Sequence, residues 1–297
     1  MKKENKSLSI AKEKETAILL ISCPDRKGIL SEVTTFIFKN NGNIIRADQH
    51  IDYQKSIFFA RIEWDLTEFF IPKDEIKEAF SPIAKKFQMD YTIRFNTEIQ
   101  NVAIFVSKYD HCLYDLLYRF KSNELKGGKV KLIISNHEDL RPIAQMYNIP
   151  YYYFPKTKEN KLEVEKKEIQ LIKKEKIDLI ILARYMQILS PQFVNEFKNK
   201  IINIHHSFLP AFVGAKPYHR AYERGVKIIG ATSHYVTEEV DQGPIIEQDV
   251  VRITHRDTIQ DMIRKGRDLE KIVLARAVRW HLEHKILVYD NKTVIFD

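Results

Sequence analysis

The chain has 297 residues, of which 44% are hydrophobic and 30% charged, with 9 glycines, 10 prolines and 2 cysteines. At about 150 residues per domain this length predicts two domains, and the composition excludes collagenous, disordered and disulfide-stapled chains. The 48 Lys and Arg against 40 Asp and Glu leave a formal net charge of +8, but lysines and glutamates are interleaved, as in residues 156–176. We therefore expect a solvated basic surface and no nucleic-acid partner.

The cysteines and the apolar runs predict the cellular compartment of the protein. Cys23 and Cys112 lie far apart in the sequence and form no short metal-binding spacing, which is typical of thiols in a reducing compartment. The apolar run 17–21 is too short for a secretory signal. The densest run, 177–183, contains Asp178 and falls well below the roughly 18 apolar residues of a membrane span. The sequence thus predicts a cytoplasmic protein without membrane contact.

After a charged tail (residues 1–15), the first elements follow the order strand, helix, strand, strand, helix, strand. The first helix carries Ile29, Val33 and Ile37 at helical spacing and stops at Asn41-Gly42. This order predicts a βαββαβ ferredoxin-like domain over residues 16–96. The expected strands are 16–22, 43–52, 56–65 and 91–95, and the expected helices are 28–41 and 72–87.

A polar linker (residues 97–101) leads into a region, 102–297, in which strands alternate with helices. This alternation predicts an α/β domain with a Rossmann-like parallel sheet covered on both faces, and ligands bind such sheets at the carboxyl ends of the strands. The expected strands are 102–106, 131–135, 151–154, 179–183, 201–205, 227–235 and 245–253; the expected helices are 111–123, 138–147, 162–176, 191–199 and 257–284, before a final hairpin turned at 290–291.

Polar side chains gather at the end of one of these strands. In the run 201–207, IINIHHS, strand alternation puts Asn203, His205 and Ser207 on one face. A buried amide and imidazole are costly unless they are satisfied or used, and by themselves these two could simply cap loop carbonyls. Asp241, just before a Gly-Pro turn, adds a carboxylate. Together the three suit acyl transfer, with Asp241 orienting His205 and with Asn203 stabilising an oxyanion by about 3 kcal/mol.

A zinc site is a second way to use these histidines. Imidazole and carboxylate ligands are available from His205, His206, His234 and Asp241. The adjacent His205 and His206 should, however, point to opposite faces of a strand. We therefore expect no metal, and we place His219 on an exposed helix.

The segments Asn203-Ile-His205, Ser207-Phe-Leu-Pro210 and residues 230–246, GATSHYVTEEVDQGPII, resemble the folate-dependent formyltransferase family. The resemblance covers most of residues 102–297 and implies that Asn203, His205 and Asp241 form the catalytic set. It also implies that two segments contact folate through their backbones: Met186, Gln187, Ile188 and Leu189, and Thr237, Glu238, Glu239 and Val240. His137 is a candidate pocket residue, with a simple loop histidine as the alternative. Arg184 and Lys216 are candidate partners for the folate glutamate tail, with an exposed surface charge as the default for both.

The N-terminal elements resemble an ACT domain. The resemblance rests on residues 24–30, PDRKGIL, and on residues 41–44, NGNI. It implies a small-molecule regulatory module with an amino-acid effector near Gly28 and Asn43. Because ACT domains pair, it also implies a homodimer or homotetramer.

The loop after the first strand of the second domain bears on which molecule accepts the formyl group. Residues 106–113, VSKYDHCL, contain no glycine, so a glycine-rich cradle for an acceptor phosphate is missing. Water fits as the acceptor, and the domain order resembles hydrolytic members of the family. The resemblance therefore implies hydrolysis of 10-formyltetrahydrofolate to formate and tetrahydrofolate without a further cofactor, supplying formate for purine synthesis and balancing the folate pool.

Three points stay open at this level. The first proton of the reaction goes either to His205 or to Asp241. A formyltransferase with an amine acceptor would need a second pocket, which the sequence does not reveal. A non-catalytic sensor of folate and an amino acid would have no need for Asn203, His205 and Asp241 together.

Overall fold

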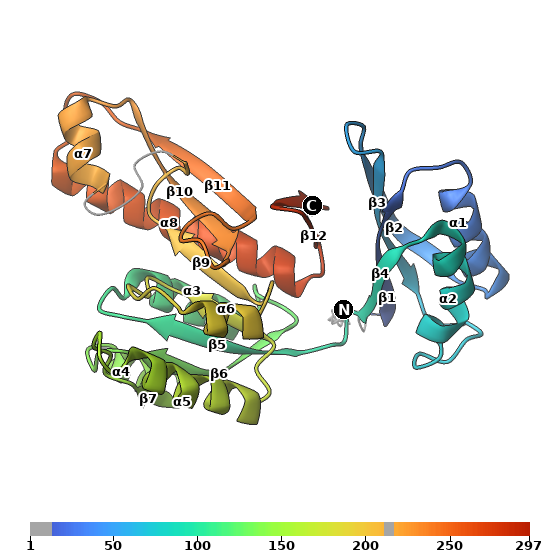
Figure 1. Cartoon of the computed structure of the whole chain (residues 1–297), viewed down its shortest axis with the longest axis horizontal. Coiled ribbons are helices and arrows are strands. Elements are labelled where there is room, and N and C mark those ends of the chain that lie inside the picture. The colour runs from blue at the N-terminus through green and yellow to red at the C-terminus, as the bar shows by residue number, and fades with distance from the viewer. Residues whose placement is uncertain (1–13, 211–216) are drawn as a thin grey trace, which may run out of the picture. The chain divides into compact units, whose positions relative to one another are not determined.

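The computed structural model describes residues 14–210 and 217–297, and the chain divides into two compact units, Met1–Glu98 and Ile99–Asp297 (Figure 1). Residues 1–13 of the predicted charged tail, and Lys216, lie outside the described residues. Among the helices that the structure describes, none is long and apolar enough to cross a membrane.

The first unit has the predicted ferredoxin-like arrangement. Its sheet has the antiparallel order β2-β3-β1-β4, and both helices lie on one side of it (Figure 1). Ile29, Val33 and Ile37 are buried against the sheet, as their spacing predicted. The elements are β1 (Thr16–Pro24), α1 (Ile29–Lys39), β2 (Asn43–Asp52), β3 (Ile57–Asp65), α2 (Ile76–Phe87) and β4 (Asp90–Phe95).

The second helix of this unit begins later than the sequence suggested. Pro72 does not open the helix; its carbonyl accepts a hydrogen bond from the Glu75 N–H at 2.9 Å in a turn, and α2 starts at Ile76. The expectation of a helical start at Pro72 was wrong because the backbone first makes a turn over residues 72–75.

The second unit carries a seven-stranded sheet. Gln100 and Asn101, expected in the linker, are the first residues of its strand β5. Its elements are β5 (Gln100–Val106), α3 (His111–Lys121), β6 (Gly128–Ser135), α4 (Arg141–Met146), β7 (Tyr151–Tyr153), α5 (Lys161–Lys174), β8 (Leu179–Leu182), α6 (Pro191–Glu196), β9 (Ile201–His205), α7 (Pro217–Arg224), β10 (Ile228–Tyr235), β11 (Ile245–Arg252), α8 (Ile259–Leu282), β12 (Ile286–Tyr289) and β13 (Lys292–Ile295).

The strand order is β11-β10-β9-β8-β5-β6-β7. The five strands from β5 to β9 are parallel, as predicted, whereas β10 runs antiparallel to both β9 and β11. The sheet is therefore mixed at one edge, because the chain re-enters it after α7 from the end at which β9 left it.

Alternation along the central strand shows why both faces are covered. Val102, Ile104 and Val106 belong to the apolar core shared with α3 and α8, and Ala103 and Phe105 to the core shared with α5 and α6. The next strand in sequence, β6, lies on one side of β5, whereas β8 lies on the other. The chain thus reverses its winding between β5 and β8, which opens a crevice at the carboxyl ends of these strands.

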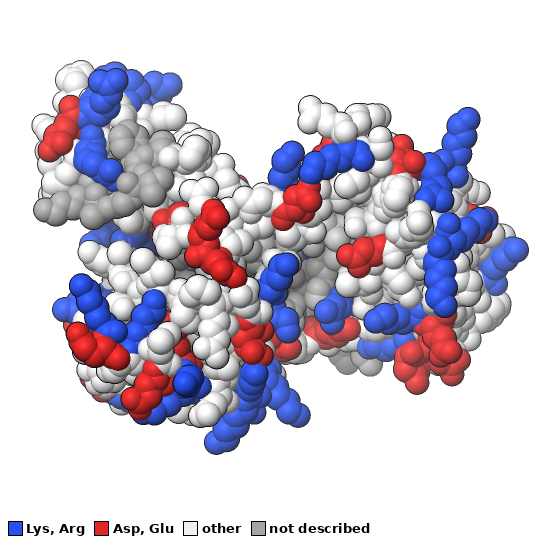
Figure 2. Space-filling model, in the orientation of Figure 1, with Lys and Arg blue, Asp and Glu red and all other residues white. Residues whose placement is uncertain are grey.

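The excess of basic residues is not gathered into one patch on the face that Figure 2 shows. Lys and Arg side chains lie among Asp and Glu side chains over both units there. This distribution agrees with the solvated basic surface expected from the sequence.

Candidate active site

A cavity of about 560 Å³ lies at the carboxyl ends of β5, β8 and β9, at the point where the winding reverses. Its wall contains the three candidate catalytic residues and all the candidate folate-contacting residues except Glu239. His137 does not line it either. The predicted residues that do line the cavity are Asn203, His205, Asp241, Met186, Gln187, Ile188, Leu189, Thr237, Glu238 and Val240.

His137 and its neighbour Asn136 both lie outside the lining of this cavity. Asn136 is buried and its Oδ1 accepts a hydrogen bond from Ser107 Oγ at 2.7 Å. The His137 carbonyl accepts from Tyr151 OH at 2.6 Å. That His137 belongs to the pocket stays a prediction.

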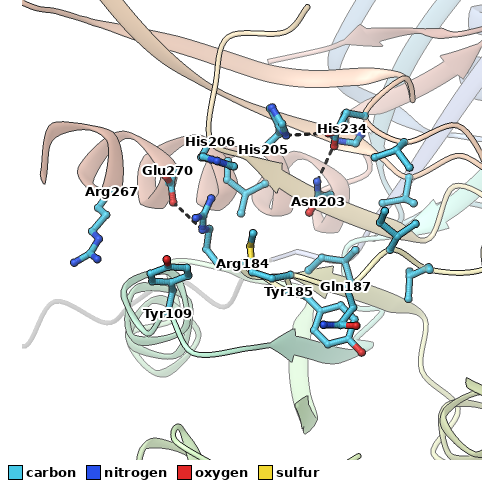
Figure 3. A pocket seen from close by; sticks show the side chains of 18 of the residues that line it. Tyr109, Arg184, Tyr185, Gln187, Asn203, His205, His206, His234, Arg267 and Glu270 are labelled. Atoms are coloured by element: carbon cyan, nitrogen blue, oxygen red, sulfur yellow. Dashed lines mark hydrogen bonds and ion pairs between the residues drawn. The ribbon is translucent and has the colours of Figure 1, made fainter. Parts of the chain in front are cut away.

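His205 lies beside Asn203 and His234 in the cavity wall (Figure 3) and is paired with Asp241. His205 Nδ1 lies 3.2 Å from Asp241 Oδ2, and His205 Nε2 lies 2.8 Å from Ser207 Oγ. A carboxylate only accepts, so Nδ1 carries a proton and Nε2 is left as the basic nitrogen. Burial raises the pKa of Asp241, but the hydrogen bond from His205 and the nearby imidazole of His234 outweigh it and hold that pKa below its usual range. Asp241 is therefore ionised at neutral pH.

Asn203 is held by a residue whose role the sequence did not reveal. In the antiparallel pairing of β9 with β10, Asn203 lies opposite His234, and Asn203 Nδ2 is 3.2 Å from His234 Nε2. His234 Nδ1 lies 2.9 Å from the Tyr235 carbonyl, which only accepts, so Nδ1 carries a proton. Nε2 then accepts from one N–H of Asn203. This fixes the amide so that its second N–H remains for a ligand.

The loop that carries Asp241 is packed tightly against β10. Asp241 has φ of 59°, a left-handed conformation that is uncommon outside glycine. Two residues later, a Cβ on Gly243 would lie 1.8 Å from the Tyr235 carbonyl oxygen. The C-terminal hairpin also holds the loop, since Asn291 Nδ2 donates to the Gln242 carbonyl at 2.7 Å.

Replacing Gly243 with alanine should displace this loop. The added methyl group cannot fit beside the Tyr235 backbone, so Asp241 should move away from His205, with a stability loss of about 2 kcal/mol and a fall in kcat of more than tenfold. Urea unfolding and steady-state kinetics measure the two effects. The control is Gln242→Ala in the same loop, which removes an exposed side chain and introduces no clash. Equal kcat in both variants would contradict the prediction.

The segment expected to contact folate is anchored from inside the protein. The Met186 N–H donates to Ser107 Oγ at 3.0 Å, so this amide is not available to a ligand. The sequence had led us to expect folate contacts from the backbone of the whole segment. Met186 and Ile188 are exposed apolar side chains at the cavity, with 53% and 62% of their surface accessible. Such an apolar patch beside a cavity is typical of a ligand-binding surface.

A buried polar cluster supports the other side of this segment. Lys156 Nζ lies 2.8 Å from both Glu168 Oε2 and Tyr185 OH, and the Ser190 N–H donates to Glu165 Oε2 at 3.2 Å. Lys156, Glu165 and Glu168 are almost fully buried. Buried charges are stable only when they are paired. The paired charges of this cluster therefore hold the segment between Tyr185 and Ser190 in place.

A second cluster of polar side chains lines the cavity beside the catalytic residues, and the sequence did not predict that these side chains contact one another. Arg184, considered a surface residue by default, is only 8% exposed, and its Nε lies 3.5 Å from Glu270 Oε2. Glu270 also contacts His111 Nε2 at 2.7 Å and accepts from Tyr218 OH at 2.9 Å. One signal in the sequence pointed to it: Glu270 interrupts the apolar stripe of α8, four residues after the buried Gly266.

Two findings bear on a metal. His205 and His206 do not point to opposite faces as expected; their ring centroids are 5.2 Å apart, because β9 ends at His205. Within the described residues, the group whose ligand atoms lie within 4.8 Å of one another is His111, Cys112 and Glu270. Burial, with the charge of Glu270, raises the pKa of the Cys112 thiol well above its usual value, so this thiol stays protonated and suits a metal poorly.

His206 should make the stability of the protein depend on pH. Burial and the charge of Arg184 lower the pKa of His206 to about 4, against about 6.5 in an unfolded chain. The unfolded state therefore binds a proton first as the pH falls, and the folded state loses up to about 3 kcal/mol of stability between pH 6.5 and 4.

The variant His206→Gln should lose this part of the pH dependence. We expect its free energy of urea unfolding to fall by about 2 kcal/mol less than that of the wild type between pH 7 and 4.5. His255→Gln, at an exposed position, should behave as the wild type. Parallel pH profiles for His206→Gln and the wild type would refute the assignment.

Comparison with known proteins agrees with this site. Residues 100–278 match the formyl transferase family model and residues 17–79 match the ACT domain model. The chain is 56% identical to a formyltetrahydrofolate deformylase from Synechocystis sp. over 95% of its length and 98% of that protein. It is also similar to the crystal structure of a formyltetrahydrofolate deformylase from Pseudomonas syringae pv. tomato, with 49% identity, a TM-score of 0.94, and coverage of 97% and 96% of the two chains.

A third likeness is confined to part of the chain. The phosphoribosylglycinamide formyltransferase from Anaplasma phagocytophilum shares 32% identity and a TM-score of 0.61, covering 67% of this chain and 96% of its own. The chain thus belongs to the formyl transferase family and, by its nearly full-length match to such relatives, to the formyltetrahydrofolate deformylases within it.

Proposed function

We propose that the protein hydrolyses 10-formyltetrahydrofolate to formate and tetrahydrofolate, with water as the acceptor of the formyl group. The observation that carries the proposal is the contact of His205 Nδ1 with the Asp241 carboxylate beside the oriented amide of Asn203, in one cavity wall. These groups supply a base and an oxyanion donor. The names of the similar proteins support the same substrate.

In the first step, water attacks the formyl carbon. His205 Nε2 takes one proton from the water, directly or through the hydroxyl of Ser207, which lies 2.8 Å from it. The water oxygen bonds to carbon, and the carbonyl electron pair moves to oxygen. The free N–H of Asn203 donates to this oxyanion, and ionised Asp241 stabilises the imidazolium of His205. The lowered pKa of Asp241 makes His205 the first proton acceptor.

In the second step, the tetrahedral intermediate collapses. The oxyanion re-forms a carbonyl, the bond from carbon to N10 breaks, and the imidazolium of His205 returns its proton to N10. Tetrahydrofolate leaves as the amine, and formic acid ionises at neutral pH to formate and a proton. His205 and Asp241 return to their starting states, so the cycle needs no further cofactor.

The folate ring system would lie against the two predicted segments. We place it between Met186–Leu189 and the loop residues Thr237, Glu238 and Val240, which line the same cavity. Glu239 drops out of this set, because it does not line the cavity. The apolar side chains of Met186 and Ile188 would cover a face of the ring.

A formate-release assay tests the proposal against a transferase. Purified protein and 10-formyltetrahydrofolate, with no added amine, should give formate and tetrahydrofolate in equal amounts. Formation of product only after an amine acceptor is added would favour a formyltransferase. Tight folate binding without turnover under either condition would favour a sensor.

For the N-terminal unit we propose an amino-acid effector site at Gly28 and Asn43, in a homodimer or homotetramer. Gly28 has φ of 93°, and a Cβ placed on it would meet no atom within 4 Å, so the loop before α1 leaves open space at this point. Asn43, at the start of β2, is exposed. Calorimetric titration with the common amino acids, alongside light scattering, tests both parts; heats that persist in Asn43→Ala would exclude this residue.

A further inference from the structure

The cavity has an end that the proposed reaction does not use. Tyr109, Arg184, Arg267 and Glu270 lie there, to one side of His205 and Asn203 in Figure 3, whereas Gln187 lies to the other side. Gln187 belongs to one of the two segments that we propose to contact folate. The group around Arg184 lies on the opposite side of His205 and Asn203 from Gln187.

The positive charge at this end exceeds what the protein neutralises. The guanidinium groups of Arg184 and Arg267 lie 5.0 and 5.7 Å from the centre of the Tyr109 ring, so two cations flank one aromatic side chain. The carboxylate of Glu270 is the acidic group that lines the cavity here. Its Oε2 is already 2.7 Å from His111 Nε2, and its Oε1 accepts from Tyr218.

Arg184 itself is held in a buried position with hydrogen-bonding capacity to spare. Its side chain is 9% exposed, and its Nε is buried and makes no hydrogen bond among the described residues, since Glu270 Oε2 is 3.5 Å away as an ion-pair partner. A buried donor without a hydrogen bond is costly, and in a binding cavity a ligand typically completes such a group. A planar guanidinium favours a planar carboxylate, which accepts two of its N–H groups at once.

His206 connects this end of the cavity to the catalytic histidine. Its ring centroid lies 5.2 Å from that of His205 and 6.1 Å from that of Tyr218. Burial and the charge of Arg184 lower its pKa to about 4, so it is neutral at the pH of the reaction and leaves the two arginines as the cations of this end. A small anion released at His205 therefore has a short route to Arg184.

We propose that Arg184, supported by Arg267, forms a binding site for a small carboxylate, and that the formate product occupies it. This inference rests on the proposed function for the identity of the anion. Formate held by Arg184 is withdrawn from N10, which disfavours re-formylation of tetrahydrofolate before the products separate. The site also makes formate a product inhibitor of the enzyme.

Binding of sodium formate to the folate-free protein tests the site independently of turnover. Saturation-transfer NMR on the formate proton should give a Kd that rises at least tenfold in Arg184→Gln and at least threefold in Arg267→Gln. Arg264→Gln, at an exposed position of α8 paired with Asp261, should leave the Kd unchanged. An unchanged Kd in Arg267→Gln, or no formate signal with the wild type, would overturn the proposal even if Arg184→Gln failed to fold.

Kinetics separate the product from the other carboxylate that could reach Arg184, the glutamate tail of the substrate. If formate is the occupant, Arg184→Gln weakens inhibition by formate, and the variant affects 10-formyltetrahydrofolate and an analogue without the glutamate equally. A higher KM for the glutamate-bearing substrate alone, with unchanged formate affinity, would assign Arg184 to the tail and overturn the proposal. Formate binding needs no catalysis. A protein that binds added formate but releases none from 10-formyltetrahydrofolate would therefore contradict the proposed function and not the formate site.

Discussion

Replacing Asp241 with asparagine should lower kcat about 1,000-fold and leave KM for 10-formyltetrahydrofolate nearly unchanged. Asp241 accepts from His205 Nδ1 at 3.2 Å and so keeps Nε2 free as the base. Asparagine has nearly the same shape, but its amide can donate to Nδ1 and so move the ring proton to Nε2. The variant then loses both the base and the charge that stabilises the imidazolium.

A matched control separates this effect from a general loss of acidic charge. Asp268 lies on α8 with 63% of its side chain exposed and pairs with Lys271, so Asp268→Asn should keep wild-type kcat. Thermal unfolding of both variants shows whether they fold. A folded Asp241→Asn with kcat within fivefold of the wild type would show that Asp241 does not orient the base.

Asn203→Ala should lower kcat by a factor of about 100 to 1,000, again with little change in KM. One N–H of the Asn203 amide is bound to His234, and the other is the donor that we assign to the oxyanion. An oxyanion donor acts in the transition state rather than on the bound substrate, and losing one typically costs about 3 to 4 kcal/mol of activation free energy.

The variant Asn203→Asp separates the loss of the hydrogen-bond donor from the loss of side-chain volume. It keeps the size of the side chain and removes both N–H groups, so it should lose as much activity as alanine. Gln145→Ala, which removes an exposed amide on α4, is the control. If Asn203→Asp retained wild-type kcat, the second N–H would have no part in the reaction.

Short-range patterns in the sequence predicted most of the fold. The spacing of Ile29, Val33 and Ile37 gave a helix with one buried face, and the strand alternation of residues 201–205 placed Asn203 and His205 together in the cavity wall. Such features depend only on local periodicity, because side chains return to the same face every 3.6 residues in a helix and every 2 residues in a strand. The antiparallel edge of the sheet was missed because its direction depends on where the chain leaves α7.

The missing parts of the site depend on contacts between distant residues. His234 meets Asn203 only through the register of β9 with β10, which no single segment encodes. Arg184 was read as a surface residue because a charged side chain is usually exposed, and its partner Glu270 lies on another element, late in the chain. Glu239, expected to contact folate, and His137, expected in the pocket, do not line the cavity.

Hydrolysis in water enriched in oxygen-18 tests the central claim most directly. If water attacks the formyl carbon, each turnover without an added amine should release formate with one labelled oxygen, and the labelled formate should equal the tetrahydrofolate formed. Mass spectrometry of the formate, with Asp241→Asn as the inactive control, measures this ratio. Unlabelled formate, or formyl transfer only to an added amine, would contradict water as the acceptor.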